Sequence, residues 1–290
     1  MSTSRTVAVA GATGNQGGAV ARALLRDGTR VLALTRRPQS AAADALRRDG
    51  AEVVAAYLDD RATLTSIFRR ADAVFGLTTP FESGAQSEIA QGMALIDAAA
   101  AAEVAHLVFS SIGSADRRTG IPHFEAKARV EERLAQSSIP WTILGPVFFM
   151  ENYTSPWWMP ALQEGVLPMA LPPNRSLQQV AVRDIGRFAA VVFARPQEFA
   201  GRRIDLASHE LTAEHAARVI SKASGREIRY VELPLEEMHS KGHDFALMFG
   251  WFDQVGYTAD IAGLRERFPE VGWRTFEEWA QEQDWSDLRL

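Results

Sequence analysis

Short apolar runs alternate with longer amphipathic segments along the first half of the chain. The apolar runs have the composition of buried strands and lie at 5–10, 30–35, 51–56, 71–77, 105–111 and 140–145. Segments with a helical period separate them, most plainly at 17–27, 86–102 and 124–137. Strands that alternate with helices form a parallel sheet with helices on both faces. The pattern therefore predicts an α/β fold with a doubly wound, Rossmann-like parallel sheet.

The second half of the chain has a different rhythm. Aromatic residues and prolines become frequent after residue 150, and a helical pattern at 182–196 followed by a strand-like run at 202–207 indicates a return to the sheet. Further helical patterns follow at 212–223, 234–249 and 275–284. We expect a sheet domain of residues 1–150 plus about 178–207, and a smaller α/β lobe of about 151–177 and 208–290.

Composition narrows the class of protein. The 290 residues are 47% hydrophobic and 23% charged, as in an ordinary soluble globular protein. The net charge of −5 and the lack of a long basic block argue against direct binding of nucleic acid. The absence of cysteine excludes disulfides, a thiolate nucleophile and cysteine-ligated metals. Neither a secretory signal nor a membrane-spanning segment is recognisable, so we expect a cytoplasmic protein.

A glycine-rich stretch, VAVAGATGNQGGAVARALLRDG, joins the first expected strand to the first expected helix. Gly11 permits a tight turn, Gly14 lets the backbone approach a pyrophosphate, and Gly17 allows the helix to pack against the strand. The helix N-terminus attracts negative charge through its free N–H groups and its dipole. The stretch therefore predicts a dinucleotide site, and the alternative is a tight turn without a ligand. The expected contacts are Gly11, Thr13, Gly14, Asn15, Gln16 and Gly17.

The ends of the second and third strands refine the expected cofactor. NAD-selective sites usually have Asp or Glu after the second strand, whereas Arg36 and Arg37 stand there in this chain. Because a guanidinium suits a 2′-phosphate, we expect NADP(H) to be preferred over NAD(H). The alternative is that both arginines are solvated surface charges. Asp59 and Asp60 stand where an adenine amino group could be bound, and for Asp60 the favoured role is to cap the next helix.

Small polar residues end the fourth and fifth strands. Thr78 and Thr79 follow the fourth strand, and Ser110 and Ser111 end the fifth. Ligands of open α/β sheets bind at the carboxyl edge of the strands, so we expect these residues to line the cofactor channel. The alternative is that their hydroxyl groups form only local hydrogen bonds.

Several segments together resemble the NmrA-like proteins, an atypical branch of the short-chain dehydrogenase/reductase superfamily. The similarity runs from about residue 5 to TFEEWAQ near the C-terminus. It is carried by GATGNQGGAVARALL, AYLDDRATL, LVFSSIGS, IPHFEAKARVEERL, SIPWTILGPVFFMENY and DIGRFAAVVFARPQEFAGRRIDLA. The resemblance implies an NADP-binding Rossmann-like domain with a small C-terminal lobe. Some members are redox-sensing regulators that act through partner proteins, and others resemble NADPH-dependent quinone reductases.

The helix after the fifth strand departs from the larger superfamily. A typical short-chain reductase uses a Tyr-x-x-x-Lys pair, in which tyrosine donates a proton and lysine binds the nicotinamide ribose. Here His123 stands four residues before Lys127, on the same helix face, and no tyrosine has a lysine four residues later. Histidine can donate a proton near neutral pH, so His123 and Lys127 are candidate catalytic residues. By resemblance to the family, Lys127 is also expected to bind the nicotinamide ribose of the cofactor. The alternatives are a non-catalytic histidine at the helix entry and an exposed lysine.

The loop after the sixth strand is a candidate for the substrate side of the site. By resemblance to the family, the segment PVFFMEN covers the nicotinamide, with contacts from Pro146 and Phe148 to the cofactor and from Phe149 and Asn152 to the substrate. Trp157 is a candidate to stack on a flat substrate, although paired aromatic residues more often pack in a core or lid. The family commonly has arginine before the proline, and Gly145 at this position puts that polar contact in doubt.

Metal and hydrolase chemistry have little support in the sequence. His239 and His243 are spaced as a possible metal pair on a helix, but Gly242 interrupts the helix and no H-E-x-x-H motif is present. No G-x-S-x-G nucleophile elbow is present either. We therefore expect no metal site.

Two functions remain open at this point. The first is an NADP(H)-binding regulatory protein that responds to NADPH and NADP⁺ and signals to a protein partner. The second is a reductase that transfers hydride from NADPH to a quinone or another planar acceptor, with His123 or water supplying the proton. The intact cofactor motif beside a helix without the usual tyrosine favours the first.

Overall fold

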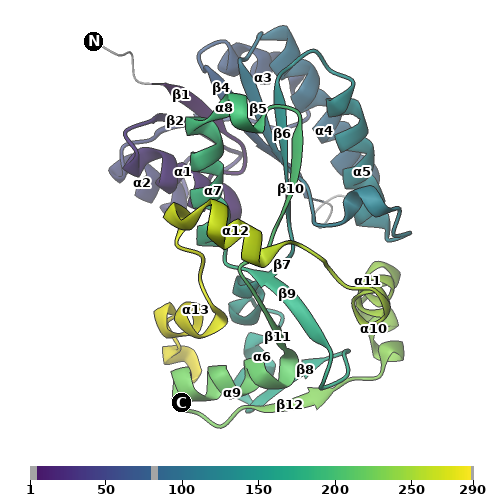
Figure 1. Cartoon of the computed structure of the whole chain (residues 1–290). Helices are drawn as coiled ribbons and strands as arrows, with labels where there is room; N and C mark the ends of the chain where they lie inside the picture. The colour runs from purple at the N-terminus through teal and green to yellow at the C-terminus, as the bar shows by residue number, and fades with distance from the viewer. Residues whose placement is uncertain (1–4, 80–83, 289–290) are drawn as a thin grey trace. The chain divides into compact units, whose positions relative to one another are not determined.

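The computed structural model describes residues 5–79 and 84–288. The chain divides into two compact units, drawn in Figure 1. The first consists of Met1–Arg118, Pro122–Gly145 and Ile185–Asp205. The second consists of Thr119–Ile121, Pro146–Asp184 and Leu206–Leu290.

A seven-stranded sheet forms the centre of the first unit, with the strand order β10-β6-β5-β4-β1-β2-β3. Its strands are β1 (Thr6–Val9), β2 (Arg30–Thr35), β3 (Glu52–Ala55), β4 (Ala73–Leu77), β5 (His106–Ser110), β6 (Trp141–Pro146) and β10 (Arg202–Leu206). The pairs from β3 to β6 are parallel, and the order reverses between β1 and β4. The expected doubly wound α/β sheet is therefore confirmed, with a topological switch point beside β1.

Helices cover both faces of this sheet. They are α1 (Asn15–Arg26), α2 (Ala41–Arg48), α3 (Arg61–Phe68), α4 (Gly84–Ala101), α5 (Pro122–Ala135), α7 (Val182–Ala194) and α8 (Pro196–Phe199), with a 3₁₀ turn at Ala115–Arg117. Figure 1 shows α3, α4 and α5 along one face and α1, α2 and α7 along the other. Because both faces are covered, most strand residues are buried whichever way they point.

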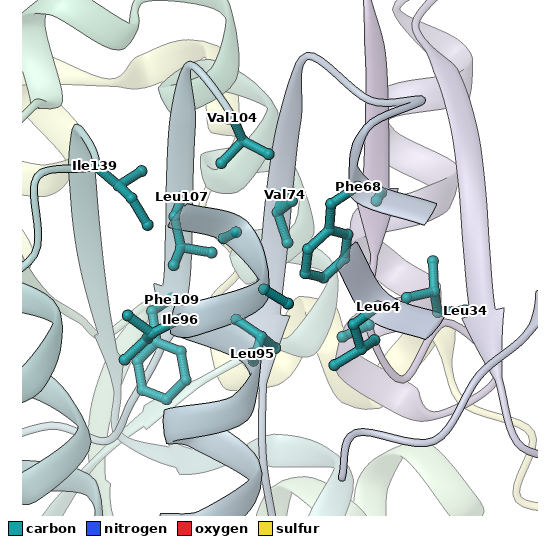
Figure 2. Packing of buried hydrophobic residues seen from close by; sticks show 14 of the residues in the cluster. Leu34, Leu64, Phe68, Val74, Leu95, Ile96, Val104, Leu107, Phe109 and Ile139 are labelled. Atoms are coloured by element: carbon teal, nitrogen blue, oxygen red, sulfur yellow. The ribbon is translucent and has the colours of Figure 1, made fainter. Parts of the chain in front are cut away.

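The core beneath α3 and α4 is continuous. Figure 2 shows Phe68 of α3 and Leu95 of α4 packed over Val74 and Leu107 of the sheet.

Glycines bring two helix pairs close together. A side chain at Gly92 of α4 would overlap Val130 of α5, and one at Gly186 of α7 would lie 2.6 Å from the backbone of Ala19 in α1. The helices are therefore fixed against each other as well as against the sheet.

The second unit contains two small sheets. One has the order β11 (His209–Thr212), β9 (Ser176–Val180) and β7 (Phe148–Phe149), and the other pairs β12 (Arg229–Glu232) with β8 (Val166–Met169). Its helices are α6 (Met159–Gln163), α9 (Ala213–Ser224), α10 (Leu235–Lys241), α11 (His243–Gln254), α12 (Ile261–Arg267) and α13 (Phe276–Glu282). Short 3₁₀ turns lie at Met150–Thr154, Pro269–Val271 and Ser286–Leu288. Within the described residues, no helix is both long and apolar enough to cross a membrane.

The helical pattern at 234–249 corresponds to two helices. α10 ends at Lys241 and α11 begins at His243, so the interruption expected at Gly242 is present in the structure. Gly242 between them has a φ of +133°, which no continuous right-handed helix accommodates. The apolar pattern continues through the break because each helix buries apolar residues, such as Met238 in α10 and Phe249 in α11.

A buried histidine links β5, β6 and α8. The Thr142 hydroxyl donates to the Phe199 carbonyl at 2.8 Å and lies 2.8 Å from Nε2 of His106, so Nε2 is the donor to Thr142. His106 Nδ1 has no hydrogen-bond partner among the described residues. Burial, assisted by the charge of Arg5, lowers the pKa of His106 to about 4. The imidazole is therefore neutral at neutral pH.

We expect this histidine to make the protein less stable in mild acid. Between about pH 6.5 and pH 4 the unfolded chain binds more protons at His106 than the folded chain, so the free energy of unfolding falls as the pH decreases. The expected contribution is about 2 kcal/mol between pH 7 and pH 5. Urea unfolding of His106→Gln, which keeps an N–H donor but does not titrate, should show a smaller loss over this range. His215→Gln, at a half-buried site, is the control. If the free energy of unfolding fell equally in wild type and in His106→Gln between pH 7 and pH 5, the prediction would be contradicted.

Candidate functional site

The glycine-rich turn is held between two strands at the switch point. Gly11 has a φ of +60°, in the left-handed region that glycine favours. The amide of Ala10 donates to the Phe75 carbonyl of β4 at 2.9 Å, and the amide of Ala12 donates to the Leu34 carbonyl of β2 at 3.1 Å. Neighbouring strands on both sides therefore fix the path of the turn.

Gly17 marks the closest approach between α1 and this turn. A Cβ atom at Gly17 would overlap the Gly11 carbonyl oxygen and would lie 2.6 Å from the Gly11 carbonyl carbon and 2.7 Å from the Ala10 carbonyl oxygen. All three neighbours are backbone atoms, so a flexible side chain cannot move aside. The position accepts only glycine, which is the role that the sequence predicts for it.

The N-terminus of α1 is exposed and carries no negative side chain. Gly14 caps the helix without a side-chain hydrogen bond, and no acidic residue lies in the first turn. Gly14 and Asn15 are both exposed. Backbone N–H groups and the positive end of the helix dipole are therefore accessible to an anion at this point.

A hydrogen-bonded link connects the glycine turn with the arginines after β2. The hydroxyl groups of Thr13 and Thr35 lie 2.9 Å apart, and the Arg37 amide donates to the Thr35 hydroxyl at 3.1 Å. Arg36 and Arg37 are exposed, whereas Thr35 is buried. The turn and the arginine pair are thus fixed relative to each other at one edge of the sheet.

The two aspartates after β3 have different surroundings. Asp60 caps α3, because its carboxylate accepts hydrogen bonds from the Thr63 amide at 3.0 Å and the Thr63 hydroxyl at 2.6 Å. The Thr63 hydroxyl and amide lower the pKa of Asp60. The capping role expected for Asp60 is therefore present in the structure. Asp59 is exposed at the same edge of the sheet.

Gln16 reaches across the switch point from the first turn of α1. Its Nε2 donates to the Ser110 hydroxyl at the end of β5, at 2.7 Å. The Ser110 hydroxyl is therefore bonded to a distant element, in contrast to the local bonding considered as an alternative. Ser111 is buried beside it, and its amide donates to the Leu144 carbonyl of β6 at 2.8 Å.

Lys127 lies at the centre of a buried polar cluster. Its ammonium group donates to the Thr78 carbonyl at 2.7 Å and the Thr78 hydroxyl at 3.0 Å, and it contacts the Ser110 carbonyl at 3.4 Å. It also pairs with the Glu88 carboxylate of α4 at 2.9 Å. The exposed lysine considered as an alternative is wrong, since only 7% of Lys127 is accessible to solvent.

Glu88 is the residue of this cluster that sequence reasoning missed. It is fully buried and accepts a hydrogen bond from the Thr78 hydroxyl at 3.1 Å. A sequence signal for it exists, because helical spacing places Glu88 on the same face of α4 as the buried residues Leu95 and Ile96. Burial lowers the pKa of Lys127, and the nearby Glu88 carboxylate opposes that shift. The Glu88 carboxylate therefore stabilises the protonated form of Lys127 against the effect of burial.

The inner face of α5 carries three titratable residues at four-residue spacing: His123, Lys127 and Glu131, all buried. His123 is in the first turn, with its ring edge-on to Phe124 at 4.7 Å. Burial raises the pKa of Glu131, whereas the Arg203 guanidinium, 2.9 Å from it, opposes this. Thr79, which follows β4, is half-buried.

The space beside Gly145 is occupied by charged groups from β10. A Cβ atom at Gly145 would overlap the Asp205 carboxylate and would lie 3.2 Å from Nη1 of Arg203. Arg203 pairs with Asp205 and donates to the Ile112 carbonyl at 2.7 Å. A guanidinium from another strand thus lies next to Gly145, the position at which the resemblance leads us to expect an arginine. The sequence around Arg203 gave no signal of this placement.

The remaining predicted residues belong to the second unit. Pro146 is buried, and Phe148 packs edge-on against Tyr153, Trp158 and Phe252 in an aromatic cluster. Phe149 and Asn152 are half-buried. Trp157 is 61% exposed, with its ring 5.3 Å from that of Phe245 in α11.

Glu151, in the same loop, has a defined structural task that sequence reasoning missed. Its carboxylate accepts from the Val182 amide at the start of α7 at 3.0 Å and from the Trp279 indole at 3.1 Å. Burial raises the pKa of Glu151 to about 7, and the nearby charge of Asp184 adds to this shift. The loop is therefore fastened to the N-terminus of α7.

His239 and His243 lie on either side of the break at Gly242, with their rings 6.2 Å apart. Within the described residues, no group of three or more His, Cys, Asp or Glu side chains has the arrangement of a metal site.

The arrangement of the glycine turn, the edge of the sheet and α5 agrees with a family comparison. The model of the NmrA-like family matches residues 3–280 of the chain. The chain belongs to the NmrA-like family. The (4-alkanoyl-5-oxo-2,5-dihydrofuran-3-yl)methyl phosphate reductase of Streptomyces griseus is 31% identical to it over 232 residues, which cover 79% of this chain and 78% of that protein.

Solved structures show the same fold for this NmrA-like chain. The negative transcriptional regulator NmrA, crystallised in complex with NAD, superposes with a TM-score of 0.79 at 22% identity, over 97% of this chain and 99% of that one. The NADPH-dependent quinone oxidoreductase of Escherichia coli, in complex with NADPH, has a TM-score of 0.76 at 24% identity, over 95% and 98%. Regulators and reductases are thus both built on this fold, and the fold alone does not choose between them.

Replacement of Gly17 tests the close approach of α1. Gly17→Ala should lower the free energy of unfolding by about 1–3 kcal/mol, because its Cβ overlaps backbone that cannot move aside. Gly14→Ala is the matched control, since its Cβ would have its nearest neighbour, the Gly11 carbonyl oxygen, at 3.4 Å. Urea unfolding of both variants measures the difference. Equal stability of the two variants would show that α1 does not approach the turn so closely.

Removal of Lys127 tests the buried ion pair. Lys127→Met should lower the free energy of unfolding by about 3–5 kcal/mol, because it leaves the Glu88 carboxylate buried without a counter-charge. The double variant Lys127→Met/Glu88→Leu should recover much of this loss. Lys222→Met, at an exposed position in α9, is the control and should change stability by less than about 0.5 kcal/mol. A Lys127→Met variant as stable as this control would refute the pairing.

Proposed function

We propose that this NmrA-like protein binds NADP(H) at the carboxyl edge of its parallel sheet and acts as a redox-responsive regulatory protein. In this proposal the pyrophosphate lies at the N-terminus of α1, and the nicotinamide half of the dinucleotide extends toward Ser110 and Lys127. The protein then responds to the ratio of NADPH to NADP⁺ and passes this response to a protein partner.

Dinucleotide binding is supported by the geometry at the switch point. Ligands of open α/β sheets bind where the strand order reverses, and here that point lies between β1 and β4. The turn with Gly11 at positive φ, the overlap that excludes a side chain at Gly17 and the exposed N-terminus of α1 together fit a pyrophosphate. Similarly folded proteins have been crystallised with NAD and with NADPH.

The preference for NADP(H) rests on the charges after β2. Arg36 and Arg37 are exposed and follow directly on Thr35, whose hydroxyl group is joined to that of Thr13 in the glycine turn. A 2′-phosphate adds negative charge at the adenosine ribose, and a guanidinium binds it through charge-assisted hydrogen bonds. No carboxylate stands between Thr35 and Pro38 to repel it.

One observation favours a regulatory protein over a catalytic reductase. The Lys127 ammonium group already has hydrogen-bond acceptors within the protein. An ammonium group has three N–H donors. Thr78 and Glu88 supply three acceptors at 2.7–3.0 Å, and the Ser110 carbonyl lies at 3.4 Å. With these partners Lys127 serves the packing of α4, α5 and the sheet. The tyrosine that such a lysine would activate is also replaced by His123.

A reductase is the second candidate, and the position of His123 favours it. This histidine is buried in the first turn of α5, one helical turn before Lys127, where a typical short-chain reductase has its proton donor. In this candidate, hydride passes from NADPH to a planar acceptor such as a quinone, and His123 or water supplies the proton. The Streptomyces griseus relative is itself named as a reductase.

Regulation requires that the two redox forms of the cofactor bind differently. A ligand shifts a conformational equilibrium only by its difference in affinity for the two states. The proposal therefore predicts unequal affinities for NADPH and NADP⁺, or an unequal effect of the two forms on protease sensitivity.

Calorimetric titration with NADPH, NADP⁺, NADH and NAD⁺ tests the proposal. We expect NADPH to bind more tightly than NADH, and the double variant Arg36→Ala/Arg37→Ala to weaken NADPH binding about 10-fold or more while NADH binding changes little. Arg26→Ala, at the far end of α1, is the control. Oxidation of NADPH at 340 nm is then followed with a panel of quinones.

The outcomes separate the two candidates. Binding without turnover, with unequal NADPH and NADP⁺ affinities, supports regulation. Turnover that falls in His123→Ala, with the thermal unfolding of the variant unchanged, supports the reductase. Absence of binding by all four dinucleotides would refute both.

A further inference from the structure

We propose that Tyr57 provides the flat surface on which the adenine ring of the bound dinucleotide stacks, so that this tyrosine determines affinity for the adenosine half. The inference rests on the proposed dinucleotide site, and it adds a residue that the glycine motif and the arginine pair do not include.

Tyr57 follows β3 at the same edge of the sheet as the arginines that follow β2. In the parallel pair β2–β3, Thr35 is in register with Ala55, and the Ala56 amide donates to the Thr35 carbonyl at 3.1 Å. The chain after β3 therefore runs next to the chain after β2, and Tyr57 leaves the sheet at the same edge as Arg36 and Arg37. This is the carboxyl edge, where open α/β sheets bind their ligands.

The side chain of Tyr57 is turned to solvent. It is 57% exposed, and the other large apolar or aromatic side chains that are exposed in the described residues belong to the second unit. The residues that follow have other tasks. Leu58 packs against the core beneath α3, and Asp60 caps that helix. The turn after β3 thus directs Leu58 inward and leaves Tyr57 and Asp59 outward.

The chemistry of this corner matches an adenosine 2′-phosphate. An aromatic ring binds a purine face by stacking, whatever the base, because every base presents a π-face. Arg36 and Arg37 supply positive charge for the phosphate on the ribose. The Asp59 carboxylate is an acceptor for the exocyclic amine of adenine. The aromatic ring, the two cations and the carboxylate thus lie together at the edge of the sheet where ligands bind.

Substitution of Tyr57 with a matched set of ligands tests this inference. Titrations of NADPH, NADH and adenosine 2′,5′-bisphosphate are carried out on wild type, Tyr57→Ala, Tyr57→Phe and Tyr57→Trp. We expect Tyr57→Ala to lower the affinity for all three ligands by a similar factor, about 5- to 30-fold. Tyr57→Phe and Tyr57→Trp should keep most of the affinity, because stacking needs the ring and not the hydroxyl. Glu52→Ala, an exposed position at the opposite end of β3, is the control.

Folding and binding effects are distinguishable in this design. Tyr57 is exposed, so thermal unfolding of Tyr57→Ala without ligand should match that of wild type. The ratio of NADPH to NADH affinity should stay constant in Tyr57→Ala, because both ligands contain adenine, whereas it should fall when the arginines are removed.

Two results would overturn the inference in different ways. Equal binding of adenosine 2′,5′-bisphosphate by wild type and Tyr57→Ala would refute stacking on Tyr57 and leave the proposed function intact. Wild-type protein that binds none of the three ligands would refute the proposed function, and the role of Tyr57 would be refuted with it.

Discussion

The backbone contact between α1 and the turn after β1 is the constraint on which the site depends. At Gly17 the helix approaches the turn so closely that only a hydrogen atom fits between them. Three consequences follow from this position of the helix. Its N-terminus faces the switch point of the sheet, Gln16 reaches the end of β5, and Thr13 meets the end of β2. A small change of helix position would break all three arrangements together.

Beneath this edge, buried and partly buried charges organise the first unit. Lys127 with Glu88, and Arg203 with Glu131 and Asp205, link α4, α5 and β10 to the strand ends. Buried ion pairs are expensive to desolvate and add little net stability compared with apolar packing. Here the ion pairs fix the relative positions of the elements, because each charged group is satisfied only by a partner at a defined position. The strand ends are therefore held in position before any ligand arrives, which reduces the ordering cost of binding.

Much of the fold could be predicted from the sequence because it depends on local period. The first six strands and the helices around 17–27, 86–102 and 124–137 lie within a few residues of their expected places. The split at Gly242 could be expected from the glycine alone, although the apolar period runs through it. The pairing of Lys127 with Glu88 was missed because it joins two helices, and periodicity within one helix carries no information about its partner. The placement of Arg203 could not be predicted for the same reason, because its neighbours come from α5 and from the loop after β5.

The ion pair at Lys127 also bears on how related sequences are interpreted. Reductases of the larger superfamily are commonly recognised by a tyrosine four residues before a lysine, a pattern that lies within one helix. In this chain the availability of the lysine depends on a carboxylate from a different helix, so the motif alone does not describe the chemical state of its own ammonium group. Two relatives with identical residues at positions 123 and 127 can therefore differ in reactivity if one has glutamate and the other an apolar residue at position 88. The residue at position 88 is therefore part of the description of this site, although it lies outside the motif.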